Sequence, residues 1–119
     1  MVADWSLSRV LLMNDARYPW LILVPRRAGA TEVHDLHVQD RTTLVEEIAR
    51  ASQGLKRLMD CAKINIGALG NLVPQLHVHI VARSAGDAAW PGPVWGNGQA
   101  QPYAAPACGK FVRELVNAL

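Results

Sequence analysis

Polar and apolar residues alternate strictly in one stretch of the chain, and the other predicted elements are arranged around it. The odd positions are Gln75, His77, His79, Val81 and Arg83, and the even positions between them are all apolar. A period of two predicts a half-buried β-strand. Side chains two residues apart share a face at roughly 7 Å spacing. This strand therefore presents an amide and two imidazoles in a row, which indicates a site.

Short apolar runs predict further strands on both sides of one long helix. Residues 9–13 and 20–24 predict a β-hairpin, and the alternation at residues 64–66 predicts another strand. Between Gln39 and Cys61, steps of three and four residues predict a helix whose apolar stripe contains Leu44, Val45, Ile48, Leu55, Leu58 and Met59. Its outer face is predicted to hold Arg41, Glu46, Glu47, Arg50, Gln53, Lys56 and Arg57.

These elements predict a single α+β domain over residues 1–119. Strands before and after one long helix favour a mostly antiparallel sheet of about five strands, with the long helix and a C-terminal helix. The core spans about residues 9–83. Residues 84–107 form an arm rich in Pro, Gly and Trp, and residues 108–119 form the closing helix.

Composition excludes several classes of function. The net charge is only +2, and the basic residues form no stripe with interleaved aromatics, so we expect no nucleic-acid partner. No apolar run reaches membrane-spanning length, and the start lacks a signal-peptide pattern, so we expect no membrane partner. Cys61 and Cys108 lack metal-ligand spacing, and we expect them to be reduced thiols of a cytoplasmic protein.

Three chemistries use a His-x-His pair on a strand. An imidazole can attack phosphorus through one nitrogen while an acceptor holds the other, and His77 stands at the centre of the row. The pair can instead bind a metal, with a third ligand drawn from Glu32, His34, Asp35 and His37. In the third case both histidines are structural. The residues alone leave these alternatives open.

The stretch from Gln75 to Val81, QLHVHIV, resembles the signature of the histidine triad (HIT) family, His-φ-His-φ-His-φ-φ, in which φ is apolar. Gln75 stands where the family has its first histidine. The order of strands, helix and glycine-rich turn is also similar to the family's, and a Trp-Pro-Gly follows at Trp90. The resemblance extends over most of residues 9–93.

The resemblance implies a HIT-like fold and a nucleotide hydrolase or nucleotidyl transferase that works through a nucleotidyl-histidine intermediate, with no required cofactor or metal. By position, His77 becomes the nucleophile and His79 contacts phosphate. Gln75 can hold an oxygen but cannot carry a proton. Leu72 stands where relatives often carry a hydroxyl, and Trp20 stands where some carry a further histidine.

The resemblance also implies the substrate-binding residues and a homodimer. Asn14 or Asp15 would bind the ribose hydroxyls, Asn65 would lie near the α-phosphate, and the turn at Gly70 and Asn71 would approach the phosphate. Trp90, in the tail motif, is a further binding candidate. Trp90 and Trp95 could instead form a lid, a dimer contact or an anchor for the arm.

Two other functions remain open at this point. The departures at Gln75 and Leu72 are also compatible with a nucleotide-binding protein of little turnover. A metal-binding protein that uses His77 and His79 is the second alternative.

Overall fold

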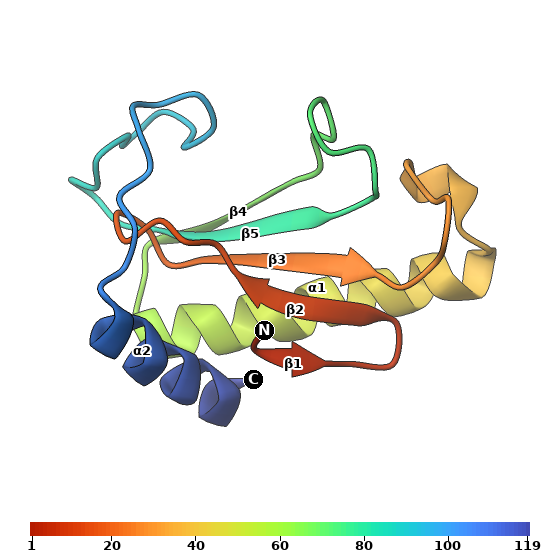
Figure 1. Cartoon of the computed structure of the whole chain (residues 1–119), viewed down its shortest axis with the longest axis horizontal. Coiled ribbons are helices and arrows are strands. Elements are labelled where there is room, and N and C mark those ends of the chain that lie inside the picture. The colour runs from red at the N-terminus through yellow and green to blue at the C-terminus, as the bar shows by residue number, and fades with distance from the viewer.

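The computed structural model describes all residues, 1–119, and has an α+β architecture (Figure 1). A short 3-10 helix, Val33–Asp35, precedes the long helix. The other elements are, in chain order, β1 (Ala3–Asp4), β2 (Ser8–Leu12), β3 (Trp20–Pro25), α1 (Val38–Met59), β4 (Lys63–Gly67), β5 (Val78–Arg83) and α2 (Ala105–Ala118). This confirms the predicted five-stranded sheet with one long and one C-terminal helix.

The five strands form one antiparallel sheet in the order β1-β2-β3-β5-β4. The predicted hairpin is β2–β3, with Val10 opposite Leu23. β5 lies between β3 and β4, so that His79 is opposite Ile22 on one side and Gly67 on the other. The strand that carries the histidine is therefore central, and both of its neighbours contribute to the surroundings of the site.

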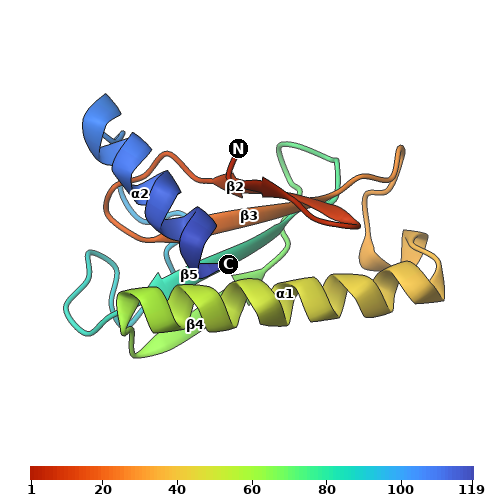
Figure 2. The same cartoon turned by 90° about the horizontal axis from the view of Figure 1, so that it is seen from below.

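Helix α1 covers one face of the sheet, and α2 packs beside α1 (Figure 2). The core under α1 combines apolar residues of the sheet with those of the helix, among them Leu21, Ile80, Leu44 and Leu55, all at most 2% exposed. Gly54 of α1 allows the end of α2 to approach closely, because a Cβ there would lie 2.6 Å from a Leu119 methyl carbon. The histidine face of the sheet is left free of helices.

Three positions of α1 differ from the predicted faces. Glu47 is only 6% exposed, because its carboxylate accepts hydrogen bonds from Leu7 N (3.1 Å) and Ser8 N (3.0 Å) at the β1–β2 turn. Val45 and Met59 are exposed although the stripe included them. The prediction was wrong at Val45 and Met59 because the sheet covers a narrower strip of the helix than the apolar pattern indicates. It was wrong at Glu47 because the carboxylate accepts hydrogen bonds from backbone N–H groups that are distant in the sequence.

The central strand begins at Val78, later than the alternation predicted. Residues before Val78 find no strand partners on either side. On one side β3 ends at Pro25, which has no N–H to donate, and on the other side β4 ends at Gly67, opposite His79. The preceding segment binds a loop instead: Leu76 N donates to Ala30 O at 2.8 Å. Alternation nevertheless persists through this segment, with Leu76 in the core and His77 half-buried.

Residues 84–104 leave β5, cross one end of the sheet and lead to α2 (Figure 1). Helix α2 begins at Ala105, earlier than the predicted start at residue 108. Pro106 lies in its first turn, where proline's missing N–H costs no helical hydrogen bond, so the Pro-rich composition hid the start of the helix. Neither helix combines the length and the apolar composition that crossing a membrane requires.

Candidate functional site

The geometry of His77 is set by the main chain of Gln75. The Nδ1 of His77 lies 2.7 Å from the carbonyl oxygen of Gln75. A carbonyl only accepts, so Nδ1 carries the proton and Nε2 keeps its lone pair. The Gln75 side chain is held in turn, because its Nε2 donates to the carbonyl oxygens of Pro25 (3.3 Å) and Arg27 (3.4 Å). Gln75 thus orients His77 through its backbone.

The second imidazole, His79, is fixed by an indole. The Nε1 of Trp20 donates to His79 Nδ1 at 3.0 Å, so the remaining proton of the neutral ring is on Nε2. His79 is 8% exposed. Its burial, with a smaller contribution from the neighbouring His77, lowers the pKa of His79 from 6.5 to about 4. At neutral pH, His79 is therefore an uncharged donor.

The two imidazoles contact each other, with ring centroids 4.9 Å apart. Trp95, from the arm, also packs against His79, with ring centroids 5.8 Å apart. Gly67 makes room for this indole, since a Cβ at that position would lie 3.0 Å from the Trp95 ring. A glycine at position 67 thus allows the close approach of Trp95.

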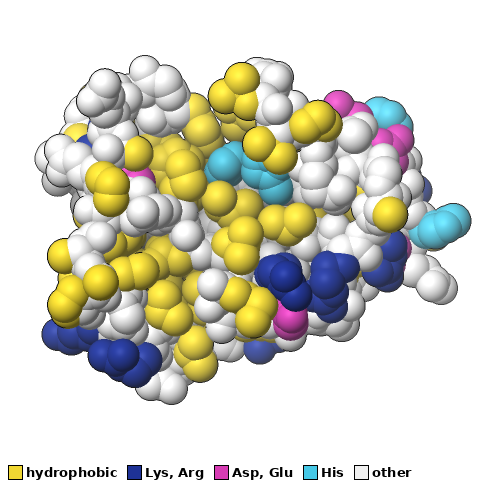
Figure 3. Space-filling view, viewed as in Figure 1, with side chains coloured by type: hydrophobic (Ala, Val, Ile, Leu, Met, Phe, Trp, Pro, Cys, Tyr) yellow, Lys and Arg dark blue, Asp and Glu magenta, His cyan; other side chains and the backbone are white.

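Three hollows open around the imidazoles. The largest of them, about 430 Å³, lies between His77, His79 and the loop of residues 69–73. A second hollow of about 320 Å³ shares His79 and Leu69 with the first and is also lined by Trp20 and Trp95. Figure 3 shows histidine side chains near the centre of this face bordered largely by hydrophobic side chains, whereas Lys and Arg side chains lie below them and toward the edges.

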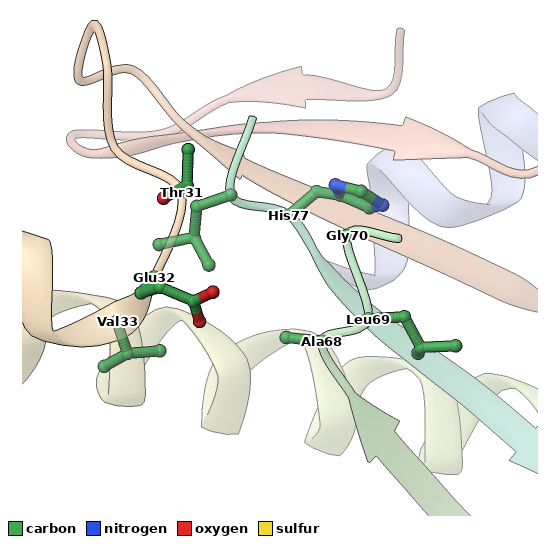
Figure 4. Close-up of a pocket in the computed structure, with 8 residues that line it drawn as sticks. Thr31, Glu32, Val33, Ala68, Leu69, Gly70 and His77 are labelled. Atoms are coloured by element: carbon green, nitrogen blue, oxygen red, sulfur yellow. The ribbon is translucent and has the colours of Figure 1, made fainter. Parts of the chain in front are cut away.

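The third hollow is a small pocket of about 30 Å³ behind His77 (Figure 4). It lies between the segment Thr31–Val33 and the turn at Gly70, and Leu69 borders it as well as the two larger hollows. Such a volume accommodates about one water molecule. His77 lines the largest hollow and the small pocket, so it lies where the loop after β4 meets the loop after β3.

The structure brings some of the predicted binding residues to the imidazoles. Gly70, at φ +75°, and Asn71 both line the hollow at His77. Asp15 lines the second hollow, but its carboxylate binds Arg17 at 2.9 Å and accepts from Gln101 N at 3.3 Å. These contacts hold the pKa of Asp15 below its usual value, the Arg17 hydrogen bond being the largest cause.

Other predicted binding residues have partners within the chain. The side-chain oxygen of Asn14 accepts from Tyr103 N at 2.9 Å, and that of Asn65 accepts from Arg83 Nη1 at 2.8 Å. Trp90 does not line the hollows at the imidazoles; its ring packs against the Arg83 guanidinium at 5.7 Å. Asn14 and Asn65 thus hold the arm and the guanidinium, respectively.

From the sequence, Trp95 could be a lid, a dimer contact or an anchor of the arm, and its contact with His79 was not predicted; neither was the role of Trp20 at His79. The position of Trp20 could have been found from strand pairing. When the second strand of the hairpin pairs with β5, its first residue, Trp20, lies opposite Val81 and so on the histidine face. The contact of Trp95 with His79 had no such signal, since residue 95 reaches His79 only through the path of the arm.

The structure contains no set of side chains that would support the metal-binding alternative. No group of three or more His, Cys, Asp and Glu side chains is placed to hold an ion. His34 lies beside Asp35, with 3.8 Å between His34 Nε2 and a carboxylate oxygen, and its side chain is 80% exposed. The predicted third ligands therefore do not join His77 and His79.

The sequence profile of the HIT domain matches residues 1–86. The chain belongs to the HIT domain family. Its match includes the whole histidine stretch and ends inside the arm. A comparison with the curated proteins gave no match.

Three solved bacterial structures are similar over nearly the whole HIT chain. A histidine triad protein from Sinorhizobium meliloti 1021 is 47% identical, with a TM-score of 0.96 and coverage of 99% of this chain and 87% of the other. One from Bradyrhizobium japonicum is 51% identical, with TM-score 0.95 and coverage of 98% and 87%. One from Marinobacter aquaeolei VT8 is 42% identical, with TM-score 0.96 and coverage of 99% and 86%. The similarity includes the arm and α2.

Proposed function

We propose that this HIT domain is a nucleotide hydrolase or nucleotidyl transferase that cleaves a substituent from the α-phosphate of a nucleoside phosphate. The observation that carries the proposal is the 2.7 Å hydrogen bond from His77 Nδ1 to the Gln75 carbonyl oxygen. It leaves the Nε2 lone pair of His77 available beside a hollow of about 430 Å³. A neutral imidazole held in this way is an activated nucleophile.

The reaction proceeds in two displacements. Nε2 of His77 forms a bond to the α-phosphorus, and the bond from phosphorus to the leaving group breaks with its electron pair going to that group. Water or another acceptor then attacks phosphorus, and the phosphorus–nitrogen bond breaks to restore His77. No step calls for a metal or another cofactor. The Gln75 carbonyl stabilises the positive charge that develops on the imidazole.

His79 is proposed to act as a phosphate ligand. Its Nδ1 is occupied by Trp20, so Nε2–H is the group it can offer to a phosphate oxygen. Gly70 and Asn71 supply the opposite wall of the hollow. Gln75 accepts a hydrogen bond from His77 at its backbone carbonyl, and its side-chain amide donates to the carbonyl oxygens of Pro25 and Arg27. Gln75 is therefore a positioning residue rather than a proton carrier.

The test is turnover of an adenosine phosphoramidate, a dinucleoside polyphosphate and a nitrophenyl ester of AMP by the wild type and by His77→Ala. We expect turnover in the wild type and a loss of about three orders of magnitude or more in the variant. Mass measurement of protein denatured at alkaline pH should show a nucleotidyl adduct that the variant lacks. A folded His77→Ala with wild-type rates would contradict the proposal.

A nucleotide-binding protein with little turnover is the second candidate. It is favoured by one observation: besides the two imidazoles, the hollow at His77 is lined by no side chain that can give a proton to a leaving group. AMP binding without turnover of any of the three substrates would support this candidate over the enzyme.

We further propose that the chain pairs as a homodimer. β4 is an edge strand, and its Ile66 is 52% exposed. Unpaired edges with apolar side chains favour association with another strand. Sedimentation equilibrium should give twice the mass of the chain, and a monomer at micromolar concentration would contradict the pairing.

A further inference from the structure

His79 is covered in part by a side chain that comes from the arm and not from the sheet. The Trp95 ring packs against the rings of His79 and Trp20, with centroids 5.8 and 6.2 Å away. The indole has no hydrogen bond of its own, because its buried Nε1 is without a partner. The place of Trp95 over His79 therefore depends on how the neighbouring part of the arm is held.

Arg17 holds the arm two residues after Trp95. It lies in the turn between β2 and β3, and its Nη1 donates to the carbonyl oxygen of Asn97 at 2.8 Å. A Cβ at Gly98 would lie 2.9 Å from the same Nη1, so the guanidinium packs directly on the main chain of the arm. The Arg17 side chain is only 12% exposed. This contact ties the turn to the segment that carries the indole.

Asp15 fixes Arg17 and the arm at the same time. Its carboxylate accepts from Nε and Nη2 of Arg17 at 3.0 and 2.9 Å, from the Arg17 backbone N–H at 3.1 Å and from the Gln101 N–H at 3.3 Å. Beside it, Ala16 N donates to Gln101 O at 2.6 Å. A carboxylate has about four acceptor positions, and four donors of the chain use them here. Asp15 is also 1% exposed, so no acceptor is left for a sugar hydroxyl.

We propose that Arg17 and Asp15 are positioning residues that hold Trp95 against His79, and that Asp15 is not a ligand of the sugar. The contact with the arm replaces the ribose contact that the resemblance implied for Asp15. The consequence for a ligand rests on the proposed function, in which His79 Nε2 donates to a phosphate oxygen. The indole shields His79 from water, so the ring stays neutral and its Nε2–H is free for phosphate. Release of the arm would admit water to this donor.

The first experiment follows His79 by NMR titration and needs no ligand. Burial is the main cause that lowers the pKa of His79 from 6.5 to about 4. Arg17→Met should free the arm and expose His79, so the pKa should rise toward 6.5, as it should in Trp95→Ala. Arg9→Met is the matched control, because Arg9 pairs with Asp4 on the exposed surface. A His79 pKa in Arg17→Met equal to that of the wild type would overturn the proposal.

A double variant tests whether Arg17 acts through the indole. Arg17→Met combined with Trp95→Ala should titrate like Trp95→Ala alone, since nothing remains for the clamp to position. A further rise of the His79 pKa in the double variant would contradict this route. Thermal melting checks that each variant folds. Arg17→Lys keeps a positive charge beside Asp15 but lacks the guanidinium fork that also reaches Asn97. Its His79 pKa should rise as well, and an unchanged pKa there would overturn the proposal even if Arg17→Met does not fold.

The second experiment asks whether the Asp15 carboxylate contacts the sugar. Calorimetry compares AMP with 2′,3′-dideoxy-AMP, which lacks both sugar hydroxyls, on the wild type, Asp15→Asn and Arg17→Met. We expect each variant to bind both nucleotides about tenfold more weakly, because the phosphate donor is disturbed, and the ratio of the two affinities to stay as in the wild type. A loss for AMP alone in Asp15→Asn would show a sugar contact and overturn the proposal.

The two experiments separate failure of this inference from failure of the proposed function. A wild type that binds neither nucleotide would contradict the proposed function. The titration of His79 would still decide the positioning role of Arg17, because it is measured on the free protein.

Discussion

The two histidines of the site differ because their Nδ1 atoms meet different partners. His77 donates from Nδ1 to a carbonyl, whereas His79 accepts at Nδ1 from the Trp20 indole. The first arrangement keeps a lone pair on Nε2, and the second keeps a proton there. His77, just before β5, and His79, within β5, therefore present an acceptor and a donor side by side, with ring centroids 4.9 Å apart.

Trp20→Phe should raise the pKa of His79 from its lowered value. The indole N–H occupies the nitrogen that would take the second proton, so its loss removes an obstacle to protonation. NMR titration of the imidazole resonances would measure the shift. Trp95→Phe is the matched control, because the Trp95 ring also contacts His79 but its buried Nε1 has no hydrogen-bond partner. Equal titration of the two variants would contradict the assigned role of Trp20.

At the residue scale, the sequence identified the imidazoles but not their partners. A period of two is a local pattern, and it placed His77 and His79 on one face. The partners come from long-range contacts: Trp20 is brought to His79 by strand pairing and Trp95 by the path of the arm. Asp15 was predicted as a ribose ligand, and its contact with Gln101 could not be read from the neighbouring residues.

At the scale of elements, α1 is fixed to the sheet by a buried carboxylate as well as by its apolar stripe. Glu47 accepts from Leu7 N and Ser8 N, which have no other acceptor in the turn between β1 and β2. This contact is polar, so a pattern of apolar positions cannot reveal it. Hydrophobic periodicity predicted the extent of the helix well, but it assigned Glu47 to the wrong face.

Glu47→Ala should lower the free energy of unfolding by about 2 kcal/mol or more, because two buried N–H groups lose their acceptor. Urea denaturation followed by circular dichroism would measure the change. Glu46→Ala is the control on the same helix, since Glu46 is exposed. A loss in Glu46→Ala as large as that in Glu47→Ala would show that helix propensity, rather than the turn contact, accounts for the effect.

At the scale of the molecule, the arm is held to the sheet by polar side chains at both of its ends. Asp87 binds the buried Arg83 through two hydrogen bonds of 2.8 and 2.9 Å and also accepts from Ser84 N, Ala89 N and Trp90 N. The Pro- and Gly-rich composition predicted an arm, but not an arm that is hydrogen-bonded in place. Its position matters for the site because it carries Trp95.

Asp87→Asn should destabilise the fold by about 3 kcal/mol, because the Arg83 charge would remain buried without its partner. The Arg83 hydrogen bond is the main cause that lowers the pKa of Asp87 from 3.8 to about 2. The wild type therefore has this stabilisation in full above pH 3.8 and loses it as the pH falls through about 2. The variant should lack that part of the acid dependence.

Thermal melting between pH 2 and pH 7 would compare the two proteins. Asp4→Asn serves as the control, because Asp4 forms only exposed pairs with Arg9 and Arg26 and should change the melting temperature far less. Parallel pH curves for the wild type and Asp87→Asn would contradict the role given to the Arg83 pair.

The hydrogen bond between Trp20 and His79 also gives the protein an optical signal of its own. A protonated imidazole quenches the emission of an indole in contact with it, and two indoles flank His79 at centroid distances of 5.6 and 5.8 Å. Tryptophan emission should therefore dim as the pH falls through the lowered pKa of His79 and reach half of its change near pH 4. A ligand that binds His79 would alter the same emission, so occupancy of the site can be followed by intrinsic tryptophan fluorescence without an added label.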